Sequence, residues 1–221
     1  MLKSQLHIHT KEDPQDRLKY SAKEVIDRAS YLNFDVIAFT FHDILFFNKE
    51  LKDYAKSKGI LLIPGIEKNI EKKHVLILGL EKLPRLEKLK DLEKIKDKAL
   101  IIAPHPFYPR HHSLNSKFVK NIEHFHAVEY SFFYLSFFNY FNKKAVKIAK
   151  IYNKPLIGTS DLHNIKKIEK TYTLIDAEKN INSIFKAIKN NKIKIITNPL
   201  SLREFIWSTI KILNPFSRKR T

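Results

Sequence analysis

Short apolar runs alternate with amphipathic segments along most of this 221-residue chain. The expected strands cover residues 3–9, 35–40, 60–66, 73–80, 99–103, 127–130, 154–158, 168–175 and 192–196. The expected helices cover residues 21–33, 48–58, 83–97, 114–123, 139–152 and 180–190. This alternation predicts one α/β domain with a mostly parallel sheet, closed or nearly closed into a barrel. Neither a Gly/Ser-rich linker nor an internal repeat divides it.

Histidines and carboxylates lie at the ends of many of these apolar runs. His7 and His9 are one residue apart on the first expected strand, so both imidazoles face the same side. Further candidates lie at the ends of later strands: His42, Glu67, His74, His105, Asp161 and His163. In parallel α/β barrels the active site lies at the carboxyl ends of the strands, so we expect these side chains to converge there.

The chain contains no cysteine, so any metal must be held by nitrogen and oxygen ligands. A His-rich cluster with a bridging carboxylate is typical of sites for two or three Zn, Mn or Fe ions. Such clusters generate hydroxide near neutral pH and stabilise both oxygens of a phosphoryl displacement.

A formal net charge of +18 favours anionic partners such as nucleotides, phosphorylated metabolites, nucleic acid or anionic lipid. The alternative is that many lysines, such as those in 82–98, only form solvated helix faces. No signal peptide and no stretch of 18 uncharged apolar residues is found, so we expect a cytoplasmic protein without a transmembrane segment.

Residues 201–221 differ from the rest of the chain. Apolar residues at helical spacing predict a helix over 201–213, followed by Pro215 and a basic stretch at 217–221. One interpretation is a helix packed on the domain of residues 1–200. The other is an amphipathic helix that binds an anionic membrane surface or a partner.

Five motifs resemble the PHP (polymerase and histidinol phosphatase) family of metal-dependent phosphoesterases over roughly residues 1–200. They are Gln5-Leu6-His7-Ile8-His9-Thr10, Thr40-Phe41-His42, Gly65-Ile66-Glu67 followed by His74, His105-Pro106, and Ser160-Asp161-Leu162-His163. Two positions depart from the family pattern, because Gln5 and Phe41 stand where the family has Asp. A carboxylate there would orient a ligating His, so the departures bear on metal affinity.

The resemblance implies a distorted (β/α)7 TIM-like barrel and a glutamate that bridges two ions. It also implies a set of nine metal ligands: His7, His9, Asp13, His42, Glu67, His74, His105, Asp161 and His163. Glu12 or Asp16 could take the place of Asp13, because the loop there varies in length.

The resulting hypothesis is hydrolysis of a phosphate ester by metal-activated water. Asp161, or a neighbouring histidine such as His105, would assist proton transfer, and Arg110 would bind a phosphate oxygen. The substrate would be a nucleotide, a small phosphorylated metabolite or the end of an oligonucleotide. Two alternatives are a non-catalytic RNA-binding subunit, resembling the PHP-like protein of ribonuclease P, and an amidohydrolase-type enzyme.

Overall fold

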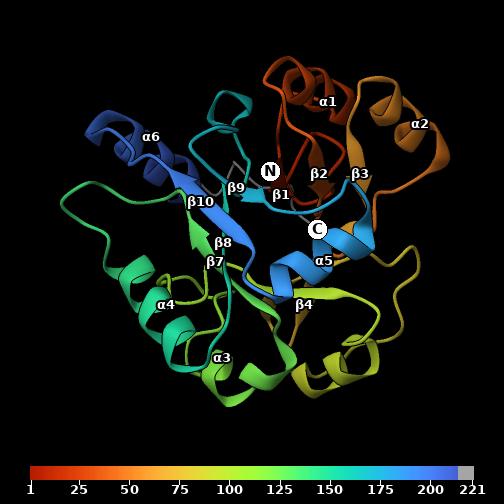
Figure 1. The fold of residues 1–221 in the computed structure, drawn as a ribbon. Helices are drawn as coiled ribbons and strands as arrows, with labels where there is room; N and C mark the ends of the chain where they lie inside the picture. Colours follow the sequence, from red (N-terminus) through yellow and green to blue (C-terminus); the bar gives the residue numbers. More distant parts are fainter. Residues whose placement is uncertain (214–221) are drawn as a thin grey trace.

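The computed structural model describes residues 1–213, which form two five-stranded sheets (Figure 1). The first sheet has the order β10-β9-β1-β2-β3. Its strands are β1 (Leu2–Ile8), β2 (Val36–Phe39), β3 (Leu61–Ile63), β9 (Thr171–Ile175) and β10 (Ile193–Thr197). β1, β2 and β3 are parallel, whereas β9 is antiparallel to both of its neighbours, β1 and β10.

The second sheet has the order β4-β5-β6-β7-β8. Its strands are β4 (Gly65–Ile70), β5 (Lys73–Leu78), β6 (Leu100–Ala103), β7 (Ala127–Ser131) and β8 (Leu156–Thr159). β5 is antiparallel to β4 and β6, whereas β6, β7 and β8 are parallel. Two isolated parallel bridges join the sheets, one between Ile8 and Leu162 and one between His42 and Glu67.

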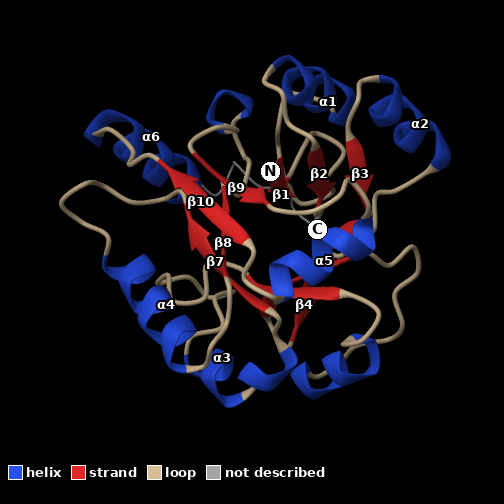
Figure 2. Cartoon of the chain, viewed as in Figure 1, coloured by secondary structure: helices blue, strands red, loops and turns tan. Residues whose placement is uncertain are grey.

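Helices surround the two sheets (Figure 2). The α-helices are α1 (Ala22–Tyr31), α2 (Lys49–Ser57), α3 (Ser116–Lys120), α4 (Tyr140–Ile151), α5 (Ile181–Lys189) and α6 (Leu202–Leu213), and the 3-10 helices are η1 (Leu89–Ile95), η2 (Ile122–His124) and η3 (Ile165–Lys167). One apolar cluster joins residues of both sheets with α5. A second packs α1 and α2 on the first sheet, and a third packs η1, α3 and α4 on the second.

A closed (β/α)7 barrel is not found, because the described strands form two separate sheets. At one boundary the expected strand 60–66 is divided at Pro64, which lacks a backbone N–H for the ladder. The chain then leaves β3 and enters β4 of the other sheet. The other boundary lies between β8 and β9. There the Thr173 hydroxyl accepts the N–H of Gly158 and donates to its carbonyl, in place of backbone ladder bonds between the two strands.

The local expectations are met where a specific sequence signal was present. Ser21 caps α1, and its hydroxyl and the Glu24 carboxylate form a capping box. The expected helix 83–97 is instead irregular up to the 3-10 helix η1. The expected helix 114–123 is shortened to α3 followed by η2.

The tail forms α6, as expected for residues 201–213, and the basic stretch 217–221 lies outside the described residues. Among the described helices, none combines the length and apolar character needed to cross a bilayer.

Candidate metal centre

β1 places the first two histidines. His7 lies within the strand and His9 follows its last residue, so both imidazoles face the same side, whereas Ile8 packs into the cluster beneath α1 and α2. Both imidazoles are fully buried, and their ring centroids are 5.1 Å apart.

One carboxylate oxygen of Glu67 faces three imidazoles. Glu67 Oε2 lies 3.5 Å from His7 Nε2, 3.4 Å from His9 Nε2 and 3.3 Å from His42 Nε2. His42 follows the end of β2, and its backbone bridge to Glu67 brings its ring close to this carboxylate. Three imidazole nitrogens around one oxygen are donors that a divalent ion of the Zn, Mn or Fe type can use together.

The other Glu67 oxygen faces two further histidines from the second sheet. Glu67 Oε1 lies 2.8 Å from His74 Nδ1 and 3.4 Å from His105 Nε2. His74 enters from β5, the partner of β4, and His105 follows β6. Because its two oxygens face different sets of imidazoles, Glu67 has the arrangement of a carboxylate that bridges two ions.

Asp161 and His163 complete the inner cluster after β8. Asp161 Oδ1 lies 3.2 Å from His163 Nδ1, 3.4 Å from His7 Nε2 and 3.6 Å from His9 Nε2. Asp161 and His105 both adopt positive φ, of 40° and 29°, which non-glycine residues rarely do. The surrounding structure therefore imposes an uncommon backbone at two of the candidate ligands, as is frequent at functional sites.

Asp13 lies on the far side of two imidazoles from Glu67. Its Oδ2 is 2.8 Å from His9 Nδ1 and 2.9 Å from His42 Nδ1, and it accepts the backbone N–H of His42 at 3.0 Å. These contacts orient the two rings so that their Nε2 atoms face Glu67. Asp16, the alternative in the same loop, lies with Oδ2 3.0 Å from His163 Nε2.

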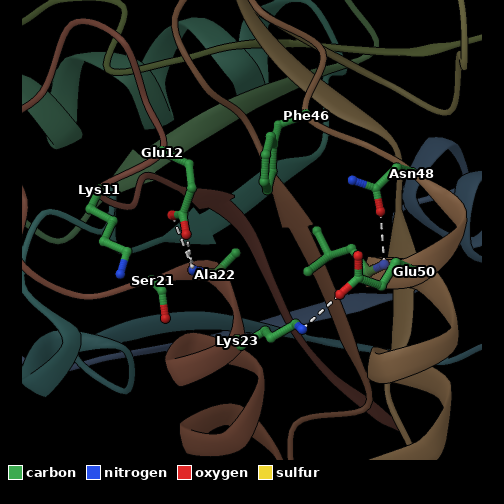
Figure 3. Close-up of a pocket in the computed structure, with 9 residues that line it drawn as sticks. Lys11, Glu12, Ser21, Ala22, Lys23, Phe46, Asn48 and Glu50 are labelled. Atoms are coloured by element: carbon green, nitrogen blue, oxygen red, sulfur yellow. Dashed lines mark hydrogen bonds and ion pairs between the residues drawn. The ribbon is translucent and has the colours of Figure 1, made fainter.

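Glu12, the third candidate in this loop, is directed elsewhere. Its carboxylate bonds the Thr10 hydroxyl and the backbone N–H of Ala22 at the start of α1. It lines a hollow between the N-terminal ends of α1 and α2, where Lys23 also pairs with Glu50 (Figure 3). None of the expected metal ligands lines that hollow, so Glu12 supports the first helix and not the cluster.

The structure adds a carboxylate that the sequence did not indicate. Glu129, in the middle of β7, is fully buried and lies with Oε1 2.7 Å from His7 Nδ1. It also accepts the Thr159 hydroxyl and the backbone N–H of His105. One signal was available, because Glu129 is a charged residue inside an otherwise apolar strand run.

The two departures from the family pattern have structural roles away from the imidazoles. Gln5 donates to the carbonyls of Ile168 and Thr171 and accepts the N–H of Ser160, so it ties β1 to the segment after β8. Phe41 is buried in an aromatic cluster with Phe39 and Phe46. Carboxylates still reach the His7 and His42 Nδ1 atoms, but they come from Glu129 and Asp13.

Arg110 stands at the edge of the cluster. Its Nη1 is 3.9 Å from Asp161 Oδ2, and its guanidinium lies over the Phe133 ring, 5.9 Å from the centroid. The side chain is partly exposed, so it can meet a ligand that approaches from solvent. The structure therefore brings all nine expected ligands and Arg110 into one region.

The charges in the cluster reinforce one another. Burial opposes the charged form of Glu67, but the imidazoles of His74 and His7 outweigh it and hold the carboxyl pKa well below its usual range. Burial likewise lowers the pKa of His7, but Asp161 and Glu129 raise it well above the usual value. The pKa of His163 is also raised well above its usual value, since Asp16 and Asp161 outweigh burial. Buried carboxylates therefore attract positive charge to this point.

The donor set fits bound divalent ions. Within residues 1–213, His7 Nε2 and His9 Nε2 are buried nitrogens without a hydrogen-bond partner, a costly state for a polar group. Three groups of ligand atoms lie close enough to share an ion: His7, His9 and Asp161; His42, Glu67 and His74; and His9, Asp13, Asp16 and His42. The nitrogen and oxygen donors suit Zn, Mn or Fe.

Fold and cluster together define a class, an α/β protein with a buried cluster of histidines and carboxylates that could hold divalent ions. Residues 139–193 match the model of the PHP-associated family. No curated protein sequence matches the chain.

Solved structures share the fold at low sequence identity. PsfC from Pseudomonas syringae has a TM-score of 0.64 at 15% identity, over 95% of this chain and 96% of that one. A protein described as a metal-dependent phosphoesterase from Bifidobacterium adolescentis has a TM-score of 0.56 at 12% identity, over 73% and 87%. A lesion-specific endonuclease from Pyrococcus furiosus has a TM-score of 0.60 at 15% identity, over 99% and 69%. The family match covers 55 of the 221 residues, and the solved structures show that the chain shares their fold.

Proposed function

We propose that the protein is a metal-dependent hydrolase of phosphate esters. The observation that carries the proposal is the Glu67 carboxylate, whose two oxygens face five imidazoles from both sheets. Eight of the nine expected ligands would hold two or three Zn, Mn or Fe ions: His7, His9, His42, Glu67, His74, His105, Asp161 and His163. The ninth, Asp13, would orient His9 and His42. When bound, such ions supply a Lewis acid for the phosphate and a water of lowered pKa.

The residues around the ions have separable tasks in this proposal. Glu129 and Asp13 hold the His7, His9 and His42 rings by their Nδ1 atoms, so that the Nε2 atoms stay directed inward. Asp161 would accept a proton at Oδ2, the oxygen that lies toward Arg110. Arg110, which points its Nη1 toward that same oxygen, would bind a phosphate oxygen of the substrate.

A nucleotide, a small phosphorylated metabolite or the end of an oligonucleotide is the proposed substrate class. The net charge of +18 supports each of these anions. The endonuclease that shares the fold supports the oligonucleotide among them. The non-catalytic alternative is less well supported, because the structure retains every expected ligand within the cluster.

The test is hydrolysis of a chromogenic phosphate monoester and of the matching diester by the purified chain with Mn or Zn. We expect turnover that His7→Ala with His9→Ala abolishes. His124→Ala is the matched control, because His124 lies in η2 and pairs with Glu93 on the surface. Turnover that survives in the double variant would exclude the site.

A further inference from the structure

Up to residue 210, where its side chains are described, the helix α6 contacts the rest of the protein through one side. Phe205 stacks on Phe133 with ring centroids 4.5 Å apart, Glu204 pairs with Lys170, and Ser208 accepts from Lys167. These contacts fix one face of the helix against the loop after β7 and the segment after η3. The helix projects at the edge of the molecule, at the left of Figure 1.

The opposite face of α6 is apolar and exposed. Leu202, Ile206 and Ile210 are spaced four residues apart and form a ridge, with exposed fractions of 58%, 49% and 55%. Trp207, 62% exposed, lies beside the ridge. Among residues 202–210, Arg203 is the charged side chain on this face, because Glu204 turns inward and pairs with Lys170. An apolar ridge that is exposed to water indicates a surface to which a partner or a membrane binds.

The charge of the C-terminal part of the sequence indicates what that partner is. Residues 130–221 hold 18 of the 41 Lys and Arg of the chain but only 5 of its 23 Asp and Glu. Four of these 18, Lys211, Arg218, Lys219 and Arg220, follow the ridge in the sequence. An apolar helix face with a tryptophan, set in a strongly basic half of the chain, combines the two features that bind an anionic bilayer surface.

We propose that the outward face of α6 inserts into the surface of an anionic lipid membrane. The ridge of Leu202, Ile206 and Ile210 enters the boundary of the acyl chains, Trp207 takes the headgroup level, and the exposed Arg203 beside the ridge meets the lipid phosphates. This inference is independent of the hydrolase proposal, because it uses none of the metal-centre residues.

Two other occupants fit the ridge less well. Nucleic acid bases stack on flat aromatic rings, whereas three of the four large side chains here are aliphatic. A second copy of the chain would need an interface of about 1,200 Å² or more, and one face of a 12-residue helix is small against that area.

The single tryptophan of the chain is itself the probe. Vesicles of phosphatidylcholine mixed with phosphatidylserine should shift the Trp207 emission of the full chain to the blue, and pure phosphatidylcholine vesicles should not. Ile206→Ser with Ile210→Ser should weaken the vesicle affinity about tenfold or more, because two apolar anchors are lost. The matched control is Tyr31→Ser, which removes an exposed ring from α1 and should bind as the wild type does.

Circular dichroism and phosphate ester turnover report whether the double variant still folds, since its substitutions face solvent. Unchanged vesicle affinity in a folded double variant would overturn the proposal. So would equal binding to neutral vesicles, a Trp207 shift produced only by an oligonucleotide, or a wild-type dimer in sedimentation that the double variant loses.

Discussion

Single carboxylates determine the orientation of the imidazole rings in this cluster. His7 and His42 each present Nε2 to Glu67 because Glu129 and Asp13 bind their Nδ1 atoms. The family pattern places acidic residues at positions 5 and 41, and here Gln5 and Phe41 serve packing and loop tethering instead. The orienting role is therefore filled from β7 by Glu129 and from the loop after β1 by Asp13.

Glu129→Gln should lower the affinity for Zn or Mn by about 10–100-fold, because the amide keeps the shape but loses the charge that makes His7 a better ligand. Chelator competition on the purified protein measures this affinity. Glu123→Gln, an exposed carboxylate in η2, is the control and should leave the affinity unchanged. Equal affinity in Glu129→Gln and wild type would show that Glu129 only fills the core.

The sequence indicated which side chains would lie together, because most of them follow apolar runs, and strand ends converge in such folds. His7, His9, His42, His105, Asp161 and His163 could be found in this way. Glu129 could not be assigned a role, because it lies inside a strand and its partner His7 is 122 residues away. The choice among Glu12, Asp13 and Asp16 also depended on the loop conformation, which no local pattern determines.

At the scale of the element, the step from β3 to β4 places Glu67. Pro64 ends the first strand, and Gly65 starts the second where the backbone passes close to β2. A Cβ atom on Gly65 would lie 2.8 Å from the Phe39 carbonyl oxygen and 2.8 Å from Leu78 Cδ2. Glycine is therefore required two residues before the bridging carboxylate.

Gly65→Ala should destabilise the protein by about 1–3 kcal/mol through this overlap, and it should weaken metal binding because Glu67 moves with the strand. Urea unfolding and chelator competition give the two quantities. Gly59→Ala is the control, since φ of +76° strains alanine by about 1–2 kcal/mol but nothing lies near its Cβ. If both variants keep full metal affinity, the position of β4 does not depend on Gly65.

Element boundaries show where sequence reasoning was limited. The capping box at Ser21 was predicted because its signal is local. The division at Pro64 depends on a proline whose effect was not included in the strand assignment. The separation into two sheets depends on pairings such as that of β4 with β5, which are not encoded in periodicity.

At the scale of the whole molecule, the charged cluster ties stability to pH and to metal. The pKa values of His7 and His163 are raised well above the usual value in the folded protein. Their protonated forms therefore stabilise the metal-free protein below the unfolded pKa of about 6.5, and this contribution is lost as pH rises through the folded values.

Divalent ions should replace those protons, so the gain in melting temperature on adding Zn or Mn should increase from about pH 6 to about pH 8. Thermal unfolding with and without metal across this range measures the gain. His124→Ala should reproduce the wild-type profile. A gain that is constant with pH would mean that metal and imidazole protons do not compete.

The central claim is that this cluster binds divalent ions, and the most direct test is the metal content of the purified full chain. It is determined by elemental analysis after loading with Zn or Mn and removal of the excess. About two or three ions per chain are expected for the wild type. A clear loss of ions is expected for Glu67→Gln, because both oxygens of Glu67 face imidazoles. A wild-type chain that retains no ion, or a Glu67→Gln variant that retains the full number, would contradict the account.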